Sequence, residues 1–429
     1  MSTLNINTLS EETFEQKEQE HSVLSTELYI VDDSNDDHRT VVPSYDLIRN
    51  TKQYTADVVK CSYDVNKWIA AGGGRTAAYG KVDGKGVYVI GTVTASSYNP
   101  GSYCYVLSST DGINFNPITI KDSIFGESRF NSIVYDDTSK AWYAGRIGVH
   151  KSTDLVNWSE TNFPKSKIAK ITVIDGKIYA AFKTTDGIVV SEDGGNSVET
   201  LCNTYAIEHI AKKGNTFVGA PMFNTDSPLI KDGVFVSTDG GNTWTNVVDK
   251  LPGFNVHRCG GIKVFNDKFI VRCNHQKDQK GGAIYWSNDG IDWTLCKGTY
   301  PTSSYDYADF FSYDLIADPN NKFLVAIPYN DENKKARIII TTDGEEWYPV
   351  YGTERGEKGN YGYYGVWTEQ GIACCGRGTD QAPFFLKNIR SDFKINLLAD
   401  AMRNIPVLAS DASTEQIVDA INVITKAFR

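Results

Sequence analysis

The sequence contains no long apolar run. Nothing in its 429 residues approaches the ~18 consecutive apolar residues that cross a bilayer. Residues 1–19 are polar and acidic, without the apolar core of a secretory signal peptide. Basic residues are in deficit, since 43 Lys and Arg stand against 53 Asp and Glu and leave a net charge of -10, which disfavours nucleic acid as a partner. We therefore expect neither a membrane nor a nucleic acid among the partners.

Paired cysteine and histidine motifs are also missing. The eight cysteines include no CxxC spacing of a zinc or redox site, and several, such as Cys273, lie in strand-like runs. We interpret them as buried free thiols of a protein made in a reducing cytoplasm. The histidines form no metal-spaced pair, and the Asp-rich stretch 32–37 lacks the Gly and final Glu of an EF-hand loop. The sequence thus predicts no metal and no cofactor.

One short turn motif, in contrast, occurs six times in the sequence. Its clearest copy is Ser-Thr-Asp-Gly-Gly-Asn-Thr-Trp, from Ser237 to Trp244. The Asp carboxylate can accept hydrogen bonds from the amides of its own turn, and the Gly supplies a positive φ without steric cost. The copies recur roughly every 40 to 50 residues, with their acids at Asp111, Asp154, Asp193, Asp239, Asp289 and Asp343. An aromatic starts the strand after most copies, including Trp158, Trp244, Trp293 and Trp347.

This repeat length suits one four-stranded sheet, and radial repetition of such sheets makes a β-propeller. Strand and turn signals alternate from residue 77 onward, which is typical of an all-β chain. A seventh unit without the turn offers three strands within 364–387, and Val58–Tyr63 can supply the fourth and close the ring. We predict an all-β fold, a β-propeller of seven four-stranded blades, with six blades as the alternative.

The two ends of the chain differ from this repeat. Residues 1–56 are polar and cannot bury a core alone, which predicts an N-terminal attachment or oligomerisation segment before the propeller at 57–390. Residues 391–429 predict a short helical tail, in which Ile417, Ile421, Ile424 and Phe428 have heptad spacing. That seam is short, so the tail either packs on its own propeller or associates with further copies, a trimer being one form.

The repeated turn resembles the Asp-box, or BNR repeat, known from sialidases and from many non-enzymatic propellers. The resemblance covers Ser109 to Trp347. In that family the box lies on the outer turn between the third and fourth strands, away from the ligand funnel. The resemblance therefore implies a structural role for the six Asp and four Trp residues named above, because fold and function are separate arguments.

Candidate ligand-binding residues lie where each innermost strand starts, since these segments face the funnel of a propeller. They include three arginines, which can grip the carboxylate of an anionic sugar or form salt bridges between blades. Nearby loops are rich in Tyr beside Asn, Asp, Ser and Gly, the composition of adaptable recognition surfaces, although such rings also serve packing. The candidates are Arg75, Arg129, Tyr205, His257, Arg258, Tyr305, Tyr307, Asp309, Tyr361 and Tyr363.

No catalytic residue can be named from the sequence. A sialidase needs an arginine cluster, a Tyr-Glu nucleophile pair and an acid Asp, with one Arg in a Phe-Arg-Ile-Pro-like motif before the first blade. The similar letters at Arg403–Pro406 lie instead in the C-terminal tail. A retaining glycosidase also needs two carboxyl groups that face one bond, and no such pair is evident.

A polar N-terminal segment, an aromatic-rich propeller and a helical C-terminus together resemble the tail fibres and receptor-binding proteins of tailed bacteriophages. That resemblance implies a non-enzymatic virion protein, made in the host cytoplasm. Its expected partners are a host-surface glycan, other virion proteins and further copies of itself. A sialidase-like glycan hydrolase is the alternative, and a purely structural virion component is the third possibility.

Overall fold

The computed structural model describes residues 53–64, 74–92, 105–120, 131–183, 186–221, 233–252, 256–275, 282–297, 315–327, 338–351, 364–375 and 383–392. The chain divides into two compact units, Ala56–Ile389 and a second one made of both chain ends, Met1–Thr55 with Arg390–Arg429. Nearly all described residues belong to the first unit. The predicted C-terminal helix and most of the N-terminal segment lie outside the described residues and stay predictions.

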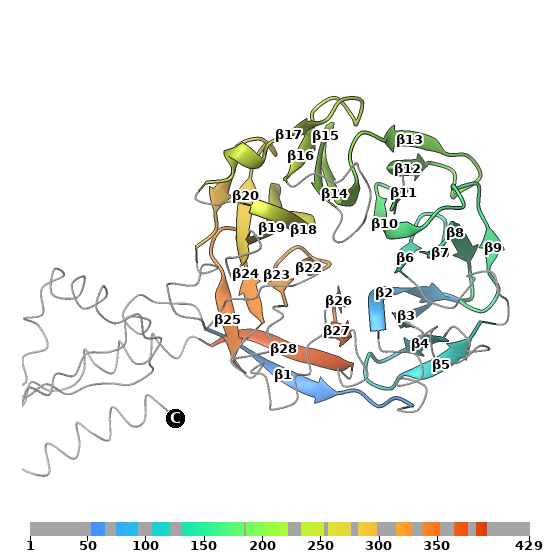
Figure 1. The fold of residues 1–429 in the computed structure, drawn as a ribbon. Helices are drawn as coiled ribbons and strands as arrows, with labels where there is room; N and C mark the ends of the chain where they lie inside the picture. Colours follow the sequence, from blue (N-terminus) through green and yellow to red (C-terminus); the bar gives the residue numbers. More distant parts are fainter. Residues whose placement is uncertain are drawn as a thin grey trace, which may run out of the picture. The chain divides into compact units, whose positions relative to one another are not determined.

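The unit Ala56–Ile389 is a ring of four-stranded antiparallel sheets, a β-propeller (Figure 1). Blade one contains β2 (Gly74–Val82), β3 (Lys85–Thr92), β4 (Tyr105–Ser109) and β5 (Asn116–Thr119). Blade two contains β6 (Ser132–Asp136), β7 (Ala141–Gly145), β8 (Val149–Ser152) and β9 (Ser159–Glu160). Blade three contains β10 (Ile168–Ile174), β11 (Lys177–Phe182), β12 (Ile188–Ser191) and β13 (Glu199–Cys202).

The next three blades repeat the pattern. Blade four contains β14 (Ile207–Lys213), β15 (Thr216–Pro221), β16 (Phe235–Ser237) and β17 (Thr245–Asn246). Blade five contains β18 (Val256–Phe265), β19 (Lys268–His275), β20 (Gly282–Ser287) and β21 (Thr294–Leu295). Blade six contains β22 (Leu315–Ala317), β23 (Leu324–Ala326), β24 (Ile339–Thr341) and β25 (Tyr348–Tyr351).

Blade seven is assembled from both ends of the ring. It contains β26 (Tyr364–Thr368), β27 (Gly371–Cys375) and β28 (Phe384–Asp392), with β1 (Gln53–Lys60) beside β28 as the fourth strand. The prediction of seven blades closed by a strand near Val58–Tyr63 is confirmed. The strand begins earlier than predicted, at Gln53, and β1 also adjoins β25, so that blades six and seven share one sheet.

The innermost strands follow one another around the ring. Contacts run from β2 to β6, β10, β14, β18, β22 and β26, and β26 contacts β2 again. Within each blade the strands pair in sequence order, so each blade except the seventh is a simple meander. Because no blade covers both faces of its own sheet, each must bury its apolar side chains against the neighbouring blades.

The hydrophobic core therefore lies between blades. One cluster joins Ala78, Val89 and Val106 of blade one to Ile133 and Trp142 of blade two. Equivalent clusters join blades two and three, three and four, four and five, five and six, and seven and one. Helix is almost absent from the described residues, where a 3-10 turn at Val248–Lys250 is an exception. No helix among the described residues is long and apolar enough to cross a membrane.

The cysteines differ from the prediction at one position. Cys61, Cys202, Cys296, Cys374 and Cys375 are buried free thiols, as expected. Cys273, however, is disulfide-bonded, and the backbone of Cys259 lies opposite it in the register of β18 and β19. The prediction of a free thiol is therefore wrong at Cys273. Sequence spacing could not reveal this, because only strand pairing brings the two positions together.

Candidate functional site

The repeated turns each hold one carboxylate inside a closed set of hydrogen bonds. In blade one, Asp111 Oδ1 accepts hydrogen bonds from the amides of Ile113 and Asn114, both at 2.8 Å, and from the Ser109 hydroxyl at 2.8 Å. The Ser109 oxygen in turn accepts a bond from the amide of Gly112 at 2.9 Å. Two side chains thus satisfy the backbone donors of a tight corner that the strand ladder cannot reach.

The same bonding recurs around the ring. Asp154, Asp289 and Asp343 repeat the pattern of Asp111. In the two copies with Gly-Gly, the turn is one residue longer. The amide four residues after the Asp therefore donates to its carboxylate, from Ser197 to Asp193 and from Thr243 to Asp239. We call these six corners the Asp turns, and in each the carboxylate supports the backbone.

Hydrogen bonds to the carboxylates lower their pKa. The hydroxyl and amide of Ser197 lower the pKa of Asp193 to about 2, and those of Thr243 do the same for Asp239. Burial alone would raise the pKa of Asp111, but the amides of Asn114 and Ile113 and the hydroxyl of Ser109 hold it well below its usual range. These carboxylates are therefore ionised at neutral pH and unsuited to act as general acids.

The lowered pKa values predict acid sensitivity. A carboxyl whose pKa is lower in the folded state stabilises the fold above its unfolded pKa, and this contribution is lost as the pH falls through the folded pKa. For Asp239 that window runs from about pH 4 down to about pH 2. Asp239→Asn removes the titrating group, so its urea midpoint should lie below that of the native chain at neutral pH, and the two should converge near pH 2.

The matched control is Asp292→Asn, whose backbone amide, rather than its carboxylate, takes part in an Asp turn. Its urea midpoint should follow that of the native chain across the same pH range. A constant offset between Asp239→Asn and the native chain at every pH would contradict the role of the ionised carboxylate.

In several Asp turns a further donor bonds to a carbonyl of the turn. In three of them the indole N–H of the turn's own Trp donates to a carbonyl of the turn: Trp158 to Leu155, Trp244 to Gly241 and Trp293 to Gly290, at 2.9 to 3.0 Å. Blade one has Phe115 in place of Trp, and here the thiol of Cys61, from the preceding blade, donates to the Gly112 carbonyl at 3.4 Å.

Blade six uses a thiol in the same way. Cys296, which follows the last strand of blade five, donates to the Gly344 carbonyl at 3.2 Å, beside the ring of Trp347. Burial raises the pKa of Cys61 to about 12 and that of Cys296 further still. Both thiols therefore stay protonated and serve as donors rather than nucleophiles.

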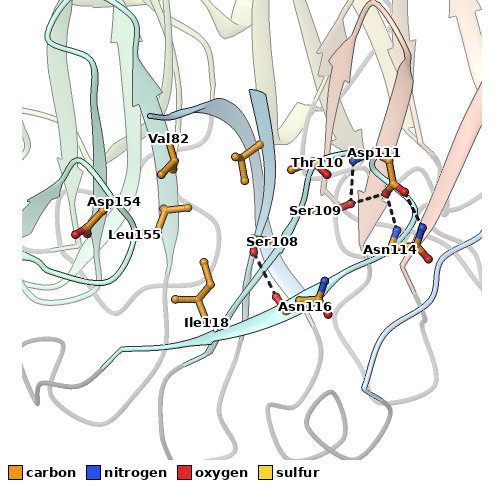
Figure 2. Close-up of a pocket in the computed structure, with 11 residues that line it drawn as sticks. Val82, Ser108, Ser109, Thr110, Asp111, Asn114, Asn116, Ile118, Asp154 and Leu155 are labelled. Carbon is orange, nitrogen blue, oxygen red and sulfur yellow. Dashed lines mark hydrogen bonds between the residues drawn. The ribbon is translucent and has the colours of Figure 1, made fainter. Parts of the chain in front are cut away.

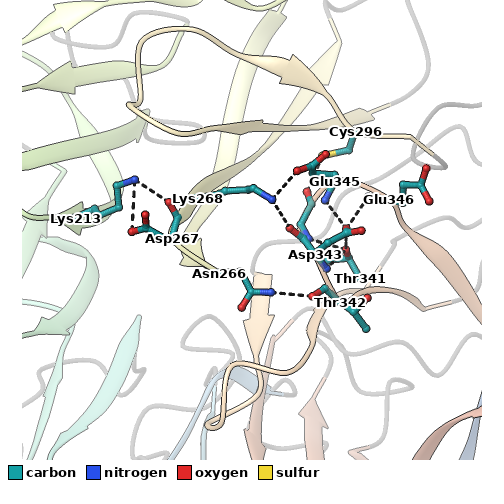
Figure 3. Close-up of polar contacts among 11 residues, drawn as sticks. Lys213, Asn266, Asp267, Lys268, Cys296, Thr341, Thr342, Asp343, Glu345 and Glu346 are labelled. Atoms are coloured by element: carbon teal, nitrogen blue, oxygen red, sulfur yellow. Dashed lines mark hydrogen bonds and ion pairs between the residues drawn. The ribbon is translucent and has the colours of Figure 1, made fainter.

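Lysines reinforce the same end of the ring (Figure 3). Lys268 of blade five reaches the Asp343 carbonyl at 3.1 Å and the Glu345 carboxylate at 2.6 Å, both in the Asp turn of blade six. Lys213 of blade four donates to the Asp267 and Asn288 carbonyls of blade five at 2.7 and 2.6 Å. These ammonium groups bond to turns of the next blade, so their positive charges stabilise the contact between blades.

The two ends of the ring therefore differ in role. In a four-stranded meander the connection between the first and second strands and that between the third and fourth lie at the same end. The Asp turns join the third strand to the fourth, whereas the innermost strand of each blade starts at the opposite end. Among the predicted ligand-binding positions, Arg75, His257 and Arg258 lie near the starts of β2 and β18, at the end without Asp turns.

The described residues include only part of that predicted set. Arg75 lies in β2, and His257 and Arg258 lie in β18. Tyr205 precedes β14, and its half-buried ring stacks on Phe235 with centroids 4.4 Å apart, so this ring takes part in packing between strands. The remaining candidates, Arg129, Tyr305, Tyr307, Asp309, Tyr361 and Tyr363, lie outside the described residues.

A pocket that the sequence did not indicate lies between blades one and two (Figure 2). Its volume is about 330 Å³. It is lined by residues of β2 to β5, by the Asp turn of blade one and by Asp154 and Leu155 of the Asp turn of blade two. Among the described residues, no group of three His, Cys, Asp or Glu side chains could hold a metal ion there or elsewhere.

Comparisons with known proteins identify the fold. No family model matches the chain, and no curated protein matches it. Among solved structures, the GH74 xyloglucanase from Xanthomonas campestris aligns with a TM-score of 0.52 at 14% identity, over 75% of this chain and 55% of that one. An ancestral GH74 enzyme aligns with a TM-score of 0.41 at 20% identity, over 57% of this chain and 34% of that one.

Hydrazine synthase from Kuenenia stuttgartiensis aligns with a TM-score of 0.44 at 11% identity, over 64% of this chain and 77% of that one. The chain spans about half of the xyloglucanase and a third of the ancestral enzyme. At these identities the likeness to the xyloglucanase shows the shared propeller fold, and folds of this kind host many functions.

Proposed function

We propose that this chain is a virion protein of tail-fibre or receptor-binding type, whose propeller binds a host-surface glycan without cleaving it. The proposal rests on the difference in role between the two ends of the ring. The Asp turns and their lysines stabilise the fold at one end, which supports a recognition role for the starts of the innermost strands at the other end. Arg75 and Arg258 belong to two of these strands, and arginine is a residue type that can hold a sugar carboxylate.

In this proposal the two terminal segments supply the attachment. Residues 1–56 join other virion proteins, and residues 391–429 associate with further copies of the chain, in a trimer or another oligomer. The protein is made in the host cytoplasm and incorporated there into the virion. Heptad spacing in the C-terminal segment supports self-association.

The alternative is a glycan hydrolase, which the fold likeness to the GH74 xyloglucanase favours. Hydrolysis requires one carboxyl group that is protonated near neutral pH to serve as the acid. The carboxylates of the Asp turns are held ionised by their own backbone, so they favour the binding proposal over this one. A purely structural virion component, with no ligand, is the third candidate.

A glycan panel separates these candidates. The native chain is incubated with fluorogenic sialosides, xyloglucan and host-surface polysaccharides, and both binding and product release are measured. We expect binding without turnover, and we expect Arg129→Ala and Arg258→Ala to weaken binding of an anionic glycan about tenfold or more, since each removes a charge-assisted contact. The matched control is Lys177→Ala, which removes one positive charge at the Asp-turn end, where Lys177 pairs with Glu192.

Each other result selects another candidate. Turnover that both arginine variants abolish would establish the hydrolase and overturn the binding proposal. Absence of binding and of turnover across the panel would favour the purely structural component. Equal weakening by Lys177→Ala would show that net charge alone, rather than the predicted face, drives binding.

A further inference from the structure

The pocket between blades one and two combines an apolar floor with a polar rim (Figure 2). Val82, Val87 and Ile118 are partly exposed and pack on the core cluster between the two blades. Around them lie the hydroxyls of Ser108 and Thr110 and the amides of Asn114 and Asn116. Such a mixture of a few convergent polar groups over apolar side chains is typical of small-molecule sites.

Backbone hydrogen bonds join some of the other blades near their Asp turns. At the seam of blades five and six, the backbone amide of Lys297 donates to the Glu345 carbonyl at 2.9 Å, and the Lys297 carbonyl accepts a hydrogen bond from the amide of Trp347 at 3.0 Å. At the seam of blades two and three, the amide of Asn162 donates to the Gly195 carbonyl at 2.8 Å. At the seam of blades one and two, β5 and the Asp turn of blade two instead meet through apolar side chains, with Ile118 packed on the cluster that contains Leu155.

The charge of the pocket restricts its ligand. Asp111 and Asp154 both contribute to the lining, and the hydrogen bonds of their turns lower the pKa of each. Two ionised carboxylates disfavour an anionic ligand by repulsion. A neutral ligand with hydroxyl groups meets no such penalty. Asp111 is exposed, and its Oδ2 accepts one bond, from the Asn114 amide at 2.6 Å, which leaves this oxygen able to accept another.

We propose that this pocket is a second binding site, which takes one neutral hexose unit of a glycan. The apolar floor suits the C–H face of a sugar ring, and the hydroxyl, amide and carboxylate groups of the rim suit its hydroxyls. The volume of about 330 Å³ lies at the small end of the range of ligand pockets, as expected for a single sugar ring. The site lies at the Asp-turn end of the ring and does not depend on the function proposed above.

The experiment titrates the full chain with the methyl glycosides of glucose, galactose and mannose and with N-acetylneuraminic acid, followed by ligand-observed NMR. We expect at least one neutral glycoside to bind with millimolar affinity. Asn116→Trp fills the pocket from the exposed start of β5 and should weaken that binding at least tenfold. The matched control is Thr245→Trp, which places the same side chain at the exposed start of β17 in blade four.

Asn116→Ala provides a milder variant and should weaken binding about threefold to tenfold, the effect of one lost hydrogen bond. The proposal is overturned if no neutral glycoside binds the native chain, if Asn116→Trp binds as well as Thr245→Trp, or if N-acetylneuraminic acid competes for the same pocket. Because Arg258 lies in β18 of blade five and the pocket is lined by blades one and two, loss of neutral sugar binding in Arg258→Ala would also count against the proposal.

Discussion

A chain that begins at Asp64 and lacks β1 is expected to lose its cooperative unfolding transition, whereas a chain that begins at Gln53 keeps it. β1 is the fourth strand of blade seven, and its removal leaves β28 without a partner on one edge. Two backbone bonds between Ser62 and the Asp turn of blade one, each at 2.8 Å, are lost as well. The truncation also removes Cys61 from the hydrophobic cluster between blades seven and one.

The expected loss is large on the scale of protein stability. Each strand or turn hydrogen bond contributes about 0.5–1.5 kcal/mol, and domains of this kind are stable by only about 5–15 kcal/mol. Removal of a whole strand and its apolar contacts therefore consumes most of the free energy of unfolding. Urea titration followed by tryptophan fluorescence measures it, and an unchanged midpoint for the chain that starts at Asp64 would refute the closure role of β1.

A truncation at the other end of the chain tests the proposed self-association. Light scattering gives the mass of the full chain and of a chain that ends at residue 392. If the C-terminal segment drives assembly, only the full chain should be larger than a monomer. Monomers in both samples would exclude this role for residues 393–429.

Trp142→Ala is expected to lower the free energy of unfolding by about 3–5 kcal/mol, the usual cost of emptying a large buried aromatic site. Trp142 is fully buried between blades one and two. Its indole N–H donates to the Lys81 carbonyl of blade one at 3.1 Å, and its ring lies 5.0 Å from that of Tyr135. The substitution therefore removes apolar contacts and also leaves a backbone acceptor without its donor.

The matched control is Trp286→Ala in β20, since Trp286 is only half-buried and lies under the ammonium of Lys268. We expect its cost to be less than half that of Trp142→Ala. Urea titrations at neutral pH compare the two variants. Equal losses would show that burial between blades is not what makes Trp142 important.

The repeated turn was sufficient to predict the ring. Asp, Gly and a following aromatic encode a local corner, and local corners are what a single sequence shows best. The closing strand was also predictable, because β26 to β28 supply only three of the four strands that a blade needs. The exact start of β1 was not, since the residues before Val58 carry no clear strand period.

Features that depend on two blades at once could not be predicted. Cys61 and Cys296 donate to turn carbonyls 51 and 48 residues further along the chain. Both cysteines follow the fourth strand of a blade in the structure, and the sequence did not show their partners. The pocket lined by Asn116 likewise depends on how blade one meets the turn at Asp154, and a pattern within one blade does not show how two blades meet. Most of the predicted ligand residues lie outside the described residues, so their role stays a prediction.

The pairing of β1 with β28 also determines how the ring responds to force. Asp57 accepts a hydrogen bond from the Asn388 side chain at 2.7 Å, and the amide of Cys61 lies 3.4 Å from the Pro383 carbonyl, so the two strands run antiparallel. Their outer ends, near Ala56 and Ile389, are neighbours. Tension applied through the two chain ends therefore loads the bonds of this pair one after another and not all together. We therefore expect blade seven to unfold first, at low force, by sequential rupture of the bonds between β1 and β28, while the other blades are still intact.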